Sequence, residues 1–116
     1  MTKTTGIIRL EAEGFARCLD REKPSHSPEV ELVFKIRWQQ IDRIIAYKDD
    51  VWAYDIICLG FYIDGNTDQY VFVDEEMEGW NDLTKRLNEV FRISNQWYFD
   101  VTFPAFERCE RTIWQR

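Results

Sequence analysis

The chain has 116 residues, of which 21 are acidic, 15 are basic, one is histidine and three are cysteine. A chain of this length forms one domain and buries roughly two-thirds of its unfolded surface, so it can build a core without disulfides. It contains no apolar run near the ~20 residues that cross a bilayer, and its first residues lack the apolar stretch of a secretion signal. We therefore expect one soluble, cytoplasmic domain over residues 1–116 that does not bind a membrane.

The net charge of −6 is unevenly distributed along the chain. Residues 49–91 carry a formal charge of −9, whereas residues 1–48 carry +2 and residues 92–116 carry +1. An acidic surface repels phosphate backbones, so no nucleic-acid partner is expected, whereas a basic protein is a compatible partner. The alternative interpretation is that the acidic residues only keep the domain soluble.

Alternation of apolar and polar residues predicts that much of the chain is strand. In 30–38 the apolar side chains alternate with charged ones, which is typical of a strand with one solvated face. Residues 55–63 are apolar on both faces, which favours a covered central strand, and Gly60 within this run indicates a bulge or a close backbone approach. Further strands are expected at 6–14, 43–48 and 69–73, with turns at 39–42, 49–55 and 64–69, while residues 15–23 fit either a strand or a helical turn.

Residues 76–91 carry the clearest helical pattern. Their apolar residues recur at helical spacing and span a stripe of about 140°; they are Met77, Trp80, Leu83, Leu87, Val90 and Phe91. Asp74 is a candidate cap, and Glu75, Glu76 and Glu78 are expected in the first turn, where the helix dipole favours negative charge. Gly79 is the one residue that disfavours a helix at its position.

After this helix, residues 96–103 alternate again and predict a strand that ends at Pro104. The tail at 105–116 fits a helix or a strand, and we favour extended structure. The predicted fold class is therefore α+β: a mostly antiparallel, curved meander of five to seven strands with one major helix at 76–91. We expect Trp80, Leu83 and Leu87 to seal the sheet and to leave a dry interior without room for reactive groups.

Few residues have the patterns of catalytic or metal chemistry. Cys18, Cys58 and Cys109 are far apart and form no zinc-type or redox spacing, so we expect reduced thiols, with Cys58 buried. Cys109 lies between Arg108 and Glu110 with Arg111 nearby, and these cations could lower its pKa, but no base partner is evident for it. His26 lies in a proline-containing loop at 21–29 without a residue to position it. We assign no catalytic residue, no cofactor and no metal ligand.

The sharpest local motif is Asp64-x-Asn66-x-Asp68 followed by Glu75. Oxygen ligands at this spacing occur in calcium-binding loops, but those loops need glycine where this chain has Gln69. A polar hairpin explains the same residues, so the motif leaves cation binding open. The acidic pairs Asp49–Asp50 and Glu75–Glu76 occur at expected turns and helix starts, where carboxylates are solvated, rather than across a cleft.

The five tryptophans suggest where a partner binds. Trp38, Trp80 and Trp97 occupy inward positions of the predicted elements and are expected in the core. Trp52 and Tyr54 lie instead in a polar turn, so we predict a partner-contact patch of aromatic residues ringed by charge, formed by Trp52, Tyr54, Asp49, Asp50 and Asp55. The alternative is that Trp52 folds back over the sheet edge. Trp114 poses the same choice between packing on the domain and contacting another subunit.

The middle of the chain resembles the small bacterial pleckstrin-homology-like domains. The resemblance rests on Ile36, Trp38, Ile41 and Ile44, followed by a hairpin at 55–73 and an amphipathic helix, and it covers residues 30–91. The chain is also similar to uncharacterised bacterial proteins, some of them proposed immunity proteins, through Glu75-Glu76-Met77-Glu78-Gly79 and Pro104-Ala105-Phe106. The resemblance implies a curved antiparallel sheet that binds proteins or lipids, although this chain lacks the dense basic loop of the lipid-binding members.

These observations favour a non-catalytic, cytoplasmic protein-interaction domain that binds a protein partner or a second copy of itself. One alternative is an immunity-type inhibitor that covers a basic toxin with its acidic face. The other is a small-ligand binder or enzyme with a pocket between sheet and helix.

Overall fold

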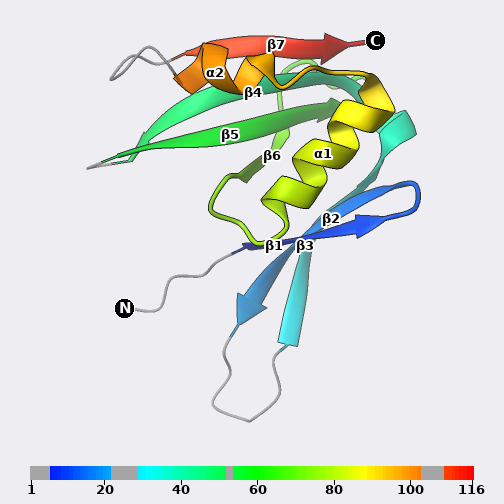
Figure 1. Cartoon of the computed structure of the whole chain (residues 1–116). Coiled ribbons are helices and arrows are strands. Elements are labelled where there is room, and N and C mark those ends of the chain that lie inside the picture. Colours follow the sequence, from blue (N-terminus) through cyan, green and yellow to red (C-terminus); the bar gives the residue numbers. More distant parts are fainter. Residues whose placement is uncertain (1–5, 22–28, 52–53, 103–108) are drawn as a thin grey trace.

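The computed structural model describes residues 6–21, 29–51, 54–102 and 109–116. This part of the chain contains seven strands and two α-helices (Figure 1). Within it, the side chains at 20–21, 29–30, 50–51 and 54 are not described. The elements are β1 (Gly6–Glu11), β2 (Gly14–Arg21), β3 (Glu29–Arg37), the short 3-10 helix η1 (Trp38–Gln40), β4 (Ile41–Val51), β5 (Tyr54–Ile63), β6 (Val71–Asp74), α1 (Trp80–Phe91), α2 (Gln96–Thr102) and β7 (Glu110–Gln115).

The strands form two antiparallel sheets rather than one meander. The first sheet has the order β1-β2-β3 and the second has the order β6-β5-β4-β7. β7 returns from the end of the chain to pair with β4, so β4 and β5 are both interior strands of the second sheet. The α+β class and the antiparallel pairing are therefore confirmed. The consecutive strands divide into two sheets because β7, and not β3, pairs with β4.

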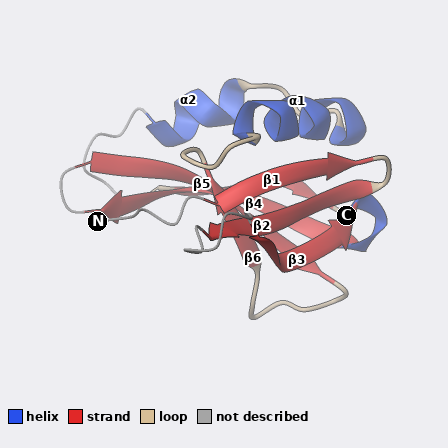
Figure 2. Ribbon diagram, turned by 90° about the horizontal axis from the view of Figure 1, so that it is seen from below, coloured by secondary structure: helices blue, strands red, loops and turns tan. Residues whose placement is uncertain are grey.

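Both helices lie on the same side of the sheets (Figure 2). Leu83 and Leu87 of α1 are fully buried and belong to the main core cluster. That cluster takes Ile8, Phe15 and Ile36 from the first sheet and Ile44, Leu59 and Phe61 from the second sheet, so α1 closes the angle between them. The rings of Phe15 and Phe61 meet across this core with centroids 5.0 Å apart.

The central strand β5 is covered on both faces, as its sequence predicts. Ile57, Leu59 and Phe61 face the helices, while Ile56 and Cys58 belong to a second cluster on the opposite face. Gly60 sits where the chain needs a close approach, because a Cβ atom there would lie 2.7 Å from the ring of Tyr70.

The long helix begins later than its pattern predicts. α1 begins at Trp80, and Gly79 before it has a φ of 92°, a left-handed conformation that glycine adopts easily. The Ile8 N–H donates to the Glu78 carbonyl at 2.8 Å, and a Cβ atom on Gly79 would lie 2.4 Å from the Ile8 carbonyl oxygen. Asp74 does not cap the helix; it accepts the N–H of Glu76 within a local turn.

The strand predicted at 96–103 is wrong, because residues 96–102 form α2. The buried side chains are Trp97 and Val101, four residues apart on one helix face, while Phe99 between them is 52% exposed. Positions 97, 99 and 101 satisfy the strand alternation, whereas positions 97 and 101 alone satisfy the helical spacing, and a segment this short does not separate the two patterns.

The remaining expectations are resolved in favour of strands. Residues 15–21 are strand in β2, the tail is extended in β7, and β4 runs from Ile41 to Val51, longer than predicted.

The Asp64–Gly65 turn has positive φ at both residues, which matches the turn chemistry expected there. Trp80 and Trp97 are buried and Trp38 is partly buried against the core. No helix in the described residues is long and apolar enough to span a bilayer.

Packing of α1 between the sheets gives a stability prediction. We expect Leu83→Ala to lower the free energy of unfolding by about 2–5 kcal/mol, because Leu83 is completely buried and its removal leaves a cavity. The matched control Val90→Ala lies on the same helix but is 41% exposed, so it should change stability by about 0.5 kcal/mol or less. Urea denaturation followed by circular dichroism measures both. Equal effects of the two substitutions would contradict the packing described.

Candidate functional site

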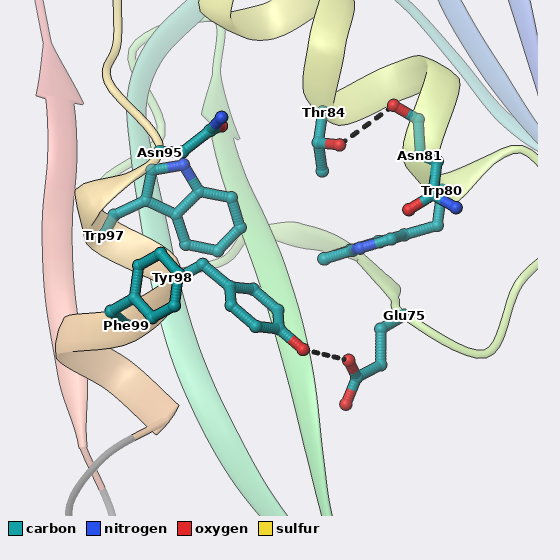
Figure 3. Close-up of a pocket in the computed structure, with 8 residues that line it drawn as sticks. All are labelled: Glu75, Trp80, Asn81, Thr84, Asn95, Trp97, Tyr98 and Phe99. Carbon is teal, nitrogen blue, oxygen red and sulfur yellow. Dashed lines mark hydrogen bonds between the residues drawn. The ribbon is translucent and has the colours of Figure 1, made fainter.

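An open cleft of about 380 Å³ lies between α1 and α2 (Figure 3). It is lined by aromatic and polar side chains, with one carboxylate and no basic residue among the described residues that form it. These residues are Glu75, Trp80, Asn81, Thr84, Asn95, Trp97, Tyr98 and Phe99.

Two short stretches of helix supply most of the lining. Trp80 and Thr84 are four residues apart and therefore share a face of α1. Trp97, Tyr98 and Phe99 follow one another on α2, so they point in different directions around this helix. Trp97 turns into the core and contacts Trp80 edge to face, with ring centroids 6.4 Å apart. Phe99 is consequently left at the surface, where it forms part of the cleft.

Glu75 joins the sheet to α2 at the base of this cleft. Its Oε1 accepts the backbone N–H of Ile57 on β5 at 3.1 Å, and its Oε2 accepts the hydroxyl of Tyr98 at 3.0 Å (Figure 3). The side chain is half-buried. Among the described residues no cation pairs with it, so hydrogen bonds alone offset the cost of removing this charge from water.

The hydroxyl of Tyr98 is held in its protonated form. Burial raises the pKa of Tyr98 above the ordinary value of 10.0, and the hydrogen bond to the Glu75 carboxylate raises it further. If Tyr98 were ionised, its oxygen could no longer donate a hydrogen bond to Glu75, and the phenolate would be repelled by the carboxylate. The Tyr98–Glu75 contact therefore contributes its full stability below pH 10 and loses it as the pH rises through the raised pKa.

The other polar groups of the cleft are also held in place. The Thr84 hydroxyl donates to the Asn81 carbonyl at 3.0 Å, one turn of α1 away. The side-chain oxygen of Asn95 accepts a hydrogen bond from the side-chain amide of Asn88. The cleft therefore presents oriented polar groups beside its aromatic walls.

This cleft corrects the expectation of a dry seam without space. Leu83 and Leu87 are fully buried within an apolar cluster, as expected. At the Trp80 end of the helix, however, there is an open space lined by a carboxylate. The difference arises because residues 96–102 form a helix and not a strand, so a second helix stands beside α1 and leaves a cleft between them.

Two further clefts differ from this one in their charge. One, of about 330 Å³, lies between α2 and β7 and contains Arg92 and Arg111. The other, of about 300 Å³, contains Arg43, whose guanidinium lies 5.1 Å from the ring centroid of Tyr62. Both therefore hold an arginine of the chain itself.

The structure describes only part of the predicted contact patch. Asp49 is exposed near the end of β4. Asp55 is instead half-buried, and its carboxylate lies 3.6 Å from the ammonium of the buried Lys48, so it helps to hold the ends of β4 and β5 together. Trp52, together with the side chains of Asp50 and Tyr54, lies outside the described residues, and the patch remains a prediction. Trp114 packs within the domain against Phe91, with ring centroids 4.5 Å apart.

The residues of the calcium-type motif do not come together. The Asp64 carboxylate accepts from the side-chain amide of Gln40, and the Asn66 side chain accepts the N–H groups of Asp68 and Gln69. Glu75 contacts Ile57, which is seven residues, or about 23 Å of extended strand, from Asp64 in the turn. Among the described residues, no group of three or more His, Cys, Asp or Glu side chains is placed to hold a metal ion.

The three thiols have no disulfide partner. Cys18 and Cys58 are buried and Cys109 is partly exposed. Burial raises the pKa of Cys58 to about 12, with the carboxylates of Asp74 and Asp49 adding to the rise. His26 lies outside the described residues. Of the paired acids, Glu76 is exposed at the surface.

Comparisons of the chain with protein-family models, with curated proteins and with solved structures find no match. The resemblance to pleckstrin-homology-like and immunity-type proteins therefore remains a prediction.

The Glu75–Tyr98 contact predicts a change in tyrosine titration. We expect Glu75→Gln to lower the pKa of Tyr98 toward 10.0, because a neutral amide neither repels the phenolate nor accepts its proton as strongly. Ultraviolet difference titration measures the change, and subtraction of the Tyr98→Phe titration assigns it. The control Glu76→Gln changes an exposed neighbouring carboxylate and should leave the titration unchanged. An unchanged pKa in Glu75→Gln would show that the contact does not affect the ionisation.

Burial of the thiols predicts their order of alkylation. In the native protein at pH 8 we expect iodoacetamide to modify Cys109 well before Cys58, because Cys58 is buried and remains protonated at that pH. Peptide mass spectrometry at successive times measures the order. In denaturant the difference should disappear. Early modification of Cys58 without denaturant would contradict its placement.

Proposed function

We propose that this chain is a non-catalytic, cytoplasmic domain that binds a basic protein partner through the α1–α2 cleft. The observation that carries the proposal is the lining of this cleft. The half-buried carboxylate of Glu75 and the 52%-exposed ring of Phe99 both border the space between the two helices. Aromatic side chains around a polar anchor are typical of the residues that dominate binding energy in protein interfaces.

The polar groups of the cleft favour binding over catalysis. Glu75 and Tyr98 are the two ionisable residues of its lining, and they are hydrogen-bonded to each other. The second carboxylate oxygen of Glu75 is held by a backbone N–H. A general acid or base must instead reach a proton on a substrate with a pKa near the working pH. Here the pKa of Tyr98 is raised away from that range.

The charge of the surrounding segment supports a basic partner. The cleft lies beside the acidic stretch that begins at Asp74, and Glu76, Glu78 and Asp82 are exposed on its surface. An acidic surface increases the rate at which a cationic partner meets it and repels acidic ones. An immunity-type inhibitor that covers a basic toxin is one form of this function, supported by the same charge. The three free thiols support a reducing compartment such as the cytoplasm.

Selection of binding peptides tests this proposal. A displayed peptide library is selected on the wild-type protein, and the dissociation constants of the recovered peptides are measured by fluorescence polarisation. We expect peptides of positive net charge, and we expect Phe99→Ala to weaken them about tenfold or more, because Phe99 is the exposed aromatic residue of the cleft.

The matched control is Phe72→Ala on β6, which removes a ring that is 40% exposed and is not part of the cleft lining. It should leave the affinities unchanged. A selection that yields no binder, or binders that are insensitive to Phe99→Ala, would overturn the proposed site.

A further inference from the structure

We infer that the α1–α2 cleft holds an arginine side chain of the partner, between its aromatic walls and the carboxylate of Glu75. This inference rests on the proposed function, since it names the group that the cleft would recognise. It extends that proposal from a general preference for basic partners to one side chain and its binding site.

The first support is the unpaired charge of the cleft. Glu75 is half-buried and accepts one hydrogen bond on each oxygen, from Ile57 and from Tyr98. An ionised carboxylate has about four lone-pair sites, so each oxygen keeps the capacity for one further donor. Neither neutral donor cancels the negative charge. A cation that enters the cleft therefore gains a charge-assisted hydrogen bond in a partly desolvated place.

The second support is the arrangement of aromatic rings around this carboxylate. Trp80, Trp97 and Tyr98 all line the space, together with the polar side chains of Asn81 and Thr84 (Figure 3). Trp80 and Trp97 meet at an interplanar angle of 74°, and Trp97 and Tyr98 meet at the same angle. The rings that border the space therefore differ in orientation. Trp80 and Trp97 are each 7% exposed, so the more accessible ring beside the carboxylate is that of the partly buried Tyr98, which is hydrogen-bonded to it. Cations are attracted to such ring faces within about 6 Å.

The third support comes from the two further clefts described above. Each of them contains an arginine of the chain: Arg92 and Arg111 in one, and Arg43 in the other. Arg43 lies over the ring of Tyr62, which is the type of contact we infer for the partner. The α1–α2 cleft has the aromatic rings and the carboxylate, but no basic residue lines it among the described residues.

Several acceptors favour arginine over lysine. A guanidinium has five N–H donors in a plane, whereas an ammonium has three donors and is more strongly hydrated. The cleft offers the Glu75 carboxylate, the Thr84 hydroxyl and the side-chain amide of Asn81 at its edges. A planar group can also lie flat on an indole or phenol ring while it donates at its edge. The space of about 380 Å³ accommodates the guanidinium with its aliphatic stem.

Three short peptides test the inference without changing the protein. Acetyl-Gly-Arg-Gly-amide, its lysine analogue and its citrulline analogue are titrated into ¹⁵N-labelled full-length protein, and the indole N–H signals of Trp80 and Trp97 are followed by NMR. Citrulline has nearly the shape of arginine but carries no charge. We expect saturable shifts with the arginine peptide, and at least tenfold weaker binding of the citrulline peptide, with the lysine peptide in between.

Glu75→Gln tests the carboxylate directly. It keeps an oxygen for the Ile57 N–H but removes the charge, and we expect it to weaken the arginine peptide at least tenfold. Glu76→Gln removes an exposed neighbouring carboxylate and should change the affinity little, and circular dichroism checks that both variants fold. If Glu75→Gln does not fold, the arginine–citrulline comparison on the wild-type protein still decides.

The outcomes separate the two proposals. Equal binding of arginine and citrulline peptides, or no binding of either, would overturn the arginine inference, and equal binding of lysine would overturn the preference for a guanidinium. In each of these cases the proposed function still stands if library-selected peptides depend on Phe99. Selected peptides that ignore Phe99 would instead overturn the proposed function, whatever the short peptides do.

Discussion

The burial of Leu83 and Leu87 between the two sheets holds the rest of the structure in place. The sheets are not closed, and these leucines belong to one core cluster that takes residues from both sheets, so the packing of α1 helps to set the angle at which the sheets meet. The helix is also tied at its ends. Before it, Glu78 pairs with β1 through the Ile8 N–H, and at its end Phe91 packs on Trp114 of β7. One wall of the cleft therefore has little freedom to move relative to either sheet.

The other wall depends on Glu75 and on the aromatic contacts of α2. A helix of seven residues is too short to be stable alone, so its position must come from packing. Trp97 and Val101 supply the buried face, and the Tyr98 hydroxyl reaches the Glu75 carboxylate, which is itself fixed on β5 through Ile57. The carboxylate thus links sheet and helix. Its desolvation is offset by two hydrogen bonds, while its charge remains available at the cleft.

Much of the fold could be predicted from the sequence because its patterns were unambiguous over long stretches. The doubly covered strand at 55–63 and the apolar stripe of Leu83 and Leu87 each reflect one dominant periodicity. The prediction of a strand at 96–102 was wrong because Trp97 and Val101 satisfy both the strand and the helix periodicity. The start of α1 was predicted too early. Glycine is needed at position 79 because the chain there lies against Ile8 of β1, and a contact between distant segments leaves no local pattern in the sequence.

The cleft could not be predicted, because it depends on where a second helix packs. Its lining comes from three segments, around residues 75, 80–84 and 95–99, and nothing in each segment alone indicates the others. One signal was present in the sequence. Trp97, Tyr98 and Phe99 are consecutive, and three successive side chains cannot all face one core, whether the backbone is helix or strand. At least one aromatic ring had to lie at or near the surface.

The structure also changes the meaning of the acidic middle segment. Part of its charge is used within the fold: Asp55 pairs with the buried Lys48, and Asp74 accepts a backbone N–H in a turn. The exposed carboxylates, such as Glu76 and Asp82, are solvated and screened over about 10 Å at ordinary salt concentration, so they can attract a partner but add little affinity once it is bound. Glu75 differs because it is half-buried beside aromatic rings, where a charge is less screened. High salt should therefore slow association through the exposed acids more than it weakens the contact at Glu75, which separates attraction of the partner from its recognition.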